Sequence, residues 1–125
     1  MTAQRVEQLA GVVQVSIKGF SAEFTKKMVD AVTIGLEPLG NSGRSATLYF
    51  LEKKNGVRLT DAFTNPSRFL ATLTEMFGLG AKILEVSISK AIAFAFGLES
   101  TPATLDIAVK GAVRQFKSSK EHRQD

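Results

Sequence analysis

The chain has 125 residues, of which 44% are hydrophobic, enough to build one domain around a single core. It contains no cysteine, which excludes a disulfide framework, a thiol nucleophile and a thiolate metal site. Its formal net charge is +4, but the basic residues are scattered, so the charge permits contact with nucleic acid or an acidic surface without indicating either.

The first 20 residues change character at Gly11. After it, Val13, Val15 and Ile17 alternate with polar residues, which is the period of a half-buried strand. A single strand is not stable alone, and the rest of the chain offers no clear partner, so a helical continuation is the alternative. We treat residues 1–20 as an N-terminal segment, strand or helix, and as a candidate association element.

The next segment is predicted to be helical from Ser21, a suitable N-cap. Its apolar residues recur every four positions on one face: Phe24, Met28, Val32 and Leu36. The helix should end before Pro38, because proline disfavours a helical conformation at the preceding residue.

A glycine-rich turn then opens a second predicted helix that stops at Gly56. Gly40 and Gly43 flank Asn41 and Ser42, and either polar residue is a suitable cap. A helix N-terminus beside Arg44 is able to hold an anion. The sequence lacks the G-x-x-x-x-G-K-[ST] spacing of a phosphate-binding loop, so we favour the capping role.

Two further helices follow the connector "VRLTDAFT". Asn65 is the predicted cap of the first and Pro66 its first residue, and Gly78 ends it. The second runs from about residue 81 to 96 and is apolar on most sides. Its predicted polar edge is narrow and consists of Lys82, Glu85 and Ser89. Such a pattern predicts the buried central helix of a small bundle.

The last helix is predicted to begin at Thr101 and Pro102. Its apolar face comprises Leu105, Ala108, Val109, Ala112 and Phe116. Residues 119–125 are predicted to be a disordered tail. The fold class expected is therefore mainly α, a compact bundle of about five short helices over residues 21–118.

Nothing in the sequence indicates catalysis. The only histidine, His122, lies in the predicted tail, and the carboxylates are spread singly along the chain, so we expect no enzyme, cofactor or metal site. For Glu85 we expect an ion pair at the helix edge with Lys82, or a contact with Ser89. Phe94 and Phe96 would line the apolar pocket of a ligand sensor, but core packing is the expected role and a small-molecule ligand is not expected.

Contact with nucleic acid is the alternative function. The candidate residues for anion or phosphate contacts are Arg44, Lys53, Lys54, Arg58, Lys110, Arg114 and Lys117. Residues 65–77 and 81–96 have the arrangement of a helix-turn-helix. The second helix, however, has no Arg, Asn or Gln to read base edges, so we expect no sequence readout.

Residues 36–92 resemble a small domain of archaeal proteins, the Nitrosopumilus-type signal-output domain. The resemblance rests on the Leu39 to Gly43 turn and on the stretches "LYFLEKKNGV", "NPSRF" and "FGLGAKILE". The family commonly has a more polar loop where this chain has "RLTDAF". The resemblance implies a non-enzymatic, cytoplasmic module that passes a signal by protein contact. We therefore expect a protein partner or self-association, and no membrane.

Overall fold

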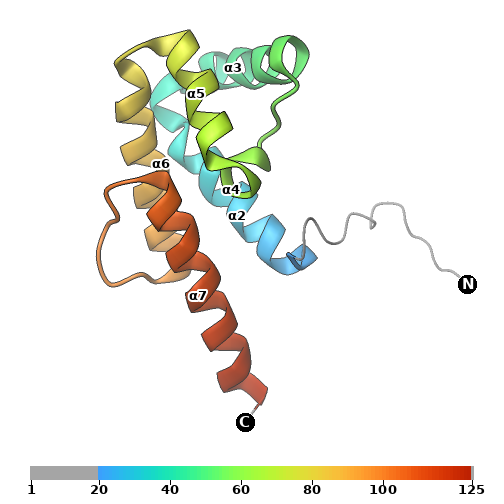
Figure 1. Cartoon of the computed structure of the whole chain (residues 1–125), viewed down its shortest axis with the longest axis vertical. Helices are drawn as coiled ribbons and strands as arrows, with labels where there is room; N and C mark the ends of the chain where they lie inside the picture. The colour runs from blue at the N-terminus through green and yellow to red at the C-terminus, as the bar shows by residue number, and fades with distance from the viewer. Residues whose placement is uncertain (1–19, 125) are drawn as a thin grey trace, which may run out of the picture.

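The computed structural model describes residues 20–124, and side chains as far as residue 118. The fold is mainly α, as expected (Figure 1). The elements in chain order are α2 (Ala22–Gly35), the 3-10 turn η2 (Glu37–Leu39), α3 (Gly40–Asn55), α4 (Asp61–Thr64), α5 (Pro66–Phe77), α6 (Gly80–Phe96) and α7 (Leu105–Gln124). The described residues include no strand, and the prediction for residues 12–20 lies almost wholly outside them.

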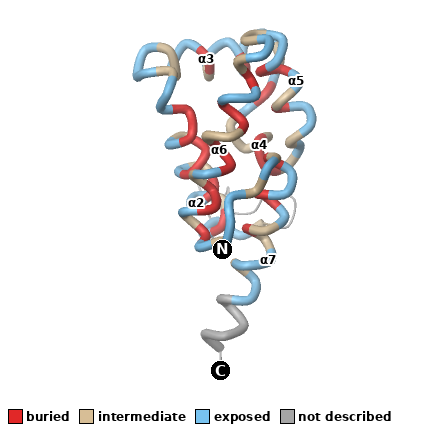
Figure 2. The backbone as a smooth tube through the Cα atoms, turned by 90° about the vertical axis from the view of Figure 1, so that its left-hand side faces the viewer, coloured by how far each residue is buried: buried red, intermediate tan, exposed pale blue. Residues whose placement is uncertain are grey.

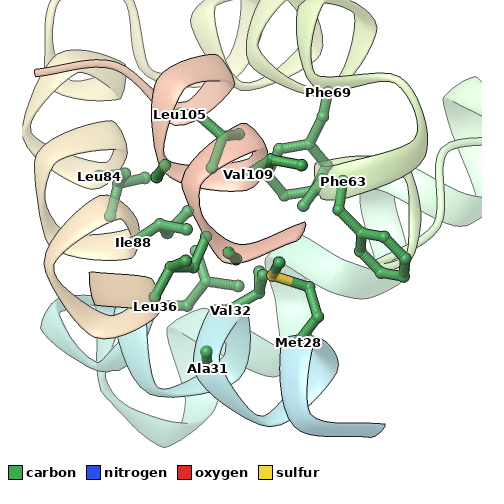
Figure 3. Close-up of a cluster of buried hydrophobic side chains, with 14 of the residues drawn as sticks. Met28, Ala31, Val32, Leu36, Phe63, Phe69, Leu84, Ile88, Leu105 and Val109 are labelled. Atoms are coloured by element: carbon green, nitrogen blue, oxygen red, sulfur yellow. The ribbon is translucent and has the colours of Figure 1, made fainter. Parts of the chain in front are cut away.

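Helices α2, α5, α6 and α7 enclose the core, which takes the predicted apolar faces of α2 and α7. Phe24, Met28 and Val32 of α2 are buried. Met28 and Val32 point into the same cluster as Leu84 and Ile88 of α6 (Figure 3). The core also takes side chains from α4, α5 and α7: Ala62, Phe63, Phe69, Leu73, Leu105, Ala108, Val109 and Ala112. Buried and exposed residues alternate along α2, α5 and α6 (Figure 2).

Helices α2 and α6 approach each other closely at Gly35. A Cβ atom placed on Gly35 would lie 2.4 Å from the Cα atom of Ile88 and 2.7 Å from its Cγ1 atom. Carbon atoms in ordinary contact are about 3.5–4.0 Å apart. The absence of a side chain at Gly35 therefore sets how closely these two helices pack.

Several predicted helix ends are confirmed. The Ser21 hydroxyl accepts a hydrogen bond from the Phe24 amide at 3.1 Å, and the Asn65 side chain accepts one from the Arg68 amide at 3.4 Å. Gly56 and Gly78 follow their helices with positive φ angles of 62° and 58°, which glycine adopts without strain.

Two predicted helix starts are wrong. Helix α3 begins at Gly40, directly after η2, and neither Asn41 nor Ser42 caps it. Helix α7 begins at Leu105 rather than at Thr101 and Pro102. The reason is that Thr104 serves as the cap: its hydroxyl accepts from the Ile107 amide at 3.2 Å.

Two segments are more helical than the sequence pattern suggested. The connector after Gly56 contains the short helix α4, and Asp61 accepts a hydrogen bond from the Arg58 amide at 2.8 Å at its start. Helix α7 continues to Gln124, into the segment predicted to be a disordered tail, residues 119–125. Lysine, glutamate, arginine and glutamine are good helix formers, and no glycine or proline interrupts α7 after Gly111.

Candidate functional site: the outer face of helix α6

One side of α6 carries large apolar side chains that no other part of the described chain covers. Leu79, at the N-cap, is 94% exposed, Ile83 is 67% exposed and Phe94 is 91% exposed. Val86 is half-buried and Lys90 is exposed between them. At 100° per residue these five side chains fall within about 80° of one another around the helix axis. We call them the α6 outer face.

The position of α6 in the bundle explains why this face is free. Its opposite side packs against α2, α5 and α7 through Ala81, Leu84, Ile88, Ile92 and Phe96. Figure 1 shows α6 along one edge of the molecule, and Figure 2 views the molecule from that side. The prediction of a helix buried all round is therefore wrong, because one side of α6 faces solvent.

The predicted polar edge of α6 is also wrong. Lys82 is exposed, but Glu85 and Ser89 are buried. Two of the three side chains that were expected to face solvent therefore face the interior of the protein. The exposed side chains of α6 include Ile83 and Phe94, which are large and apolar, beside Lys82 and Lys90. The helix thus reverses the usual pattern at these positions, and large exposed apolar patches on soluble proteins commonly mark interaction sites.

Glu85 joins α6 to α7 rather than forming a simple edge ion pair. Its Oε2 atom accepts a hydrogen bond from the Leu105 amide at 2.9 Å, at the first residue of α7. Its Oε1 atom lies 3.4 Å from Nζ of Lys82, as predicted. A carboxylate at a helix N-terminus satisfies a free amide and interacts favourably with the helix dipole. Glu85 therefore has a structural role.

Ser89 does not contact Glu85 in the way expected. Its side chain is fully buried, and its Oγ atom has no hydrogen-bond partner in the described structure. A buried hydroxyl without a partner costs stability relative to an apolar side chain of similar size.

Phe94 and Phe96 do not line a common pocket. Phe96 is 5% exposed, and its ring lies 5.3 Å from that of Phe24 and beneath Nζ of Lys27 at 5.1 Å. Phe94 lies on the outer face. The expected core role holds for Phe96 only, and the sequence signal for the difference is the spacing of Phe94 with Leu79, Ile83 and Lys90.

Three of the four basic candidates of α3 and its loop interact with other groups of the chain. Arg44 donates to the Asn41 side chain at 3.3 Å, and Arg58 lies 3.9 Å from Glu52. Lys54 lies over the ring of Phe50 at 5.8 Å. Lys53 is exposed and lies nine positions after Arg44, which places the two on opposite sides of α3.

The basic candidates of α7 form a second, separate group. Lys110 pairs with Asp106 at 3.1 Å, and Lys117 is exposed. Arg114 lines an open hollow of about 420 Å³ between α7 and the preceding loop, beside Glu99 and Ser100 of that loop. Figure 1 shows α3 at one end of the molecule and α7 running to the other. The seven candidates therefore do not form one surface.

Other kinds of site receive no geometric support. Within the part of the chain that the structure describes, no three His, Cys, Asp or Glu residues are grouped so as to hold a metal ion. None of the helices searched there has the length and apolar character needed to cross a membrane. No family model, curated protein or solved structure matches this chain.

Proposed function

We propose that this protein is a non-enzymatic interaction or signalling module that acts through protein–protein contacts made by the α6 outer face. The observation that carries the proposal is the exposure of Leu79 and Phe94, at 94% and 91%, on one side of a helix whose other side forms the core. The resemblance of residues 36–92 to a signal-output domain points in the same direction.

Physical chemistry supports this use of the face. Leaving three large apolar side chains in water forgoes the free energy of their burial, about 1.5–3 kcal/mol for each. A protein partner that covers the face would recover part of it. The rigid helix also presents the side chains in a fixed arrangement, so little conformational entropy is lost on binding.

The alternative, phosphate contact with nucleic acid, has weaker support. It requires several cations on one surface, because each neutralised phosphate adds to affinity. Arg58 and Lys110 already have carboxylate partners, and the α3 and α7 groups lie apart.

A photo-crosslinking amino acid placed at Ile83 tests the proposal. The full chain carrying it is irradiated both in purified form and in a lysate of the source cells. We expect a protein adduct, with a second copy or with another protein, that is lost when Phe94→Ser is added. A crosslinker at Tyr49, which is 66% exposed on α3, is the matched control. Equal adducts from both positions, insensitive to Phe94→Ser, would contradict the proposal.

A further inference from the structure

The α6 outer face has the spacing of a helix-pairing seam. Its members follow one another at intervals of four, three, four and four residues: Leu79, Ile83, Val86, Lys90 and Phe94. Intervals of three and four residues keep side chains on the side of a helix that meets a partner helix. The occupant that this face fits is therefore another helix with apolar side chains at the same spacing.

The α6 outer face also matches the same face of a second α6 helix that runs in the opposite direction. Leu79 and Phe94 lie equally far from the midpoint between Val86 and Ser87, and so do Ile83 and Lys90. We propose that two copies of the chain pair through α6 in antiparallel orientation, with the two-fold axis at this midpoint. Leu79 of one copy then packs against Phe94 of the second copy, at both ends of the seam.

Lys90 selects the antiparallel orientation. In a parallel pair the two Lys90 side chains would lie directly opposite each other, where like charges repel. In the antiparallel pair each Lys90 lies opposite Ile83 of the second copy, and the two ammonium-bearing positions are about 10 Å apart along the axis. The lysine stem packs on Ile83 while its charged end reaches solvent.

The exposed area is sufficient for a reversible dimer. At the exposures given above, the three large side chains present about 500 Å² per copy, or about 1,000 Å² for two copies. Val86, Ser87 and Lys90 add to this total. Stable specific interfaces bury about 1,200–2,000 Å² in all and transient ones less, so the pair has the size of a transient interface. Such a symmetric contact uses the same surface on both copies.

Single cysteines test the pairing cleanly, because the chain has no cysteine of its own. The variants L79C, F94C and S87C are treated, alone and mixed, with a thiol-specific crosslinker whose spacer of about 8 Å matches the distance between packed helix axes. The antiparallel pair predicts crosslinked dimers from S87C alone and from the L79C and F94C mixture. It predicts none from L79C alone or F94C alone, because those self-pairs are about 22 Å apart. I107C, exposed on α7, is the control for random collision.

Other patterns overturn the inference. Crosslinking of L79C and F94C each with itself would show a parallel pair. A monomer in sedimentation with no crosslinks would show that no second copy binds. A monomer whose L79C thiol reacts with a soluble reagent only after removal of residues 1–19 would show that this segment covers the face.

The inference rests on the proposed function, but the two fail differently. If the chain is monomeric while the crosslinker at Ile83 captures another protein in a Phe94-dependent manner, the antiparallel pair is wrong and the interaction module stands. If neither a second copy nor another protein is captured, both are wrong.

Discussion

Replacement of Gly35 by alanine should separate α2 from α6, the two helices that form the largest contact in the bundle. The new Cβ atom would lie 2.4 Å from Ile88 Cα and 2.7 Å from its Cγ1 atom. Since ordinary contacts are about 3.5–4.0 Å, the helices must move apart by about 1 Å. The clash with Cα cannot be relieved by a change of rotamer, because backbone atoms have none.

The cost follows from the contacts that the movement weakens. A gap of about 0.5–1 Å forfeits a quarter to a half of the dispersion energy at each atom pair, and a buried Leu or Ile makes about 40–60 such contacts. Overpacked cores typically lose about 1–3 kcal/mol. Alanine regains up to about 1 kcal/mol of helix propensity. We therefore expect Gly35→Ala to lower the free energy of unfolding by about 2 kcal/mol and the Tm by about 10 °C.

Gly80→Ala is the matched control, because the same change in α6 places a Cβ atom 3.6 Å from Cβ of Phe77, an ordinary contact. It should leave stability unchanged or raise it by up to about 1 kcal/mol. Thermal and urea unfolding followed by circular dichroism measure both variants. If Gly35→Ala matched Gly80→Ala in Tm, the close approach of α2 and α6 would be refuted.

Three further predictions concern buried polar groups and charge. Glu85→Ala leaves the Leu105 amide without its partner and should cost about 2 kcal/mol in urea unfolding, whereas Glu99→Ala, in an exposed loop, should cost less than about 0.5 kcal/mol. Equal costs would remove the structural role of Glu85. Ser89→Ala should be neutral or stabilising by up to about 1 kcal/mol, and a loss larger than that would mean that the hydroxyl has a partner in solution. Binding to labelled duplex DNA, followed by anisotropy, should be absent at physiological salt, and binding that persists there would favour the nucleic-acid alternative.

The sequence was sufficient to predict most of the fold. Ser21, Asn65 and Gly56 mark helix ends by local chemistry, and the four-residue spacing from Phe24 to Leu36 identifies the buried face of α2. These signals are local, so they need no knowledge of the neighbouring elements.

The start of α7 and the orientation of α6 were not predictable in the same way. Thr101 and Pro102 resemble a helix start, but the Leu105 amide is satisfied by Glu85, twenty residues earlier in the chain. In α6, apolar residues occur all round the helix, so periodicity alone does not choose the buried side. That choice depends on contacts with α2 and α7, which bury Glu85 and Ser89 and leave Phe94 in solvent.

The basic residues illustrate a different limit. Their number suggested a phosphate-binding surface, but phosphate binding requires that several basic side chains lie close together on one surface. Arg44 and Lys53 are on opposite sides of α3, and Lys110 has Asp106 one turn away. Net charge alone does not carry this information.

Sedimentation equilibrium of the full chain tests most directly whether the α6 outer face is an interaction surface. We predict that the wild type shows a molar mass that rises with concentration from the 13.5 kDa monomer toward the dimer. The variant Leu79→Ser/Phe94→Ser should remain monomeric with unchanged Tm, and Tyr49→Ser/Ile107→Ser, which removes exposed apolar side chains elsewhere, should associate like the wild type. A dimer that survives Leu79→Ser/Phe94→Ser, or is lost only with the control, would contradict the account.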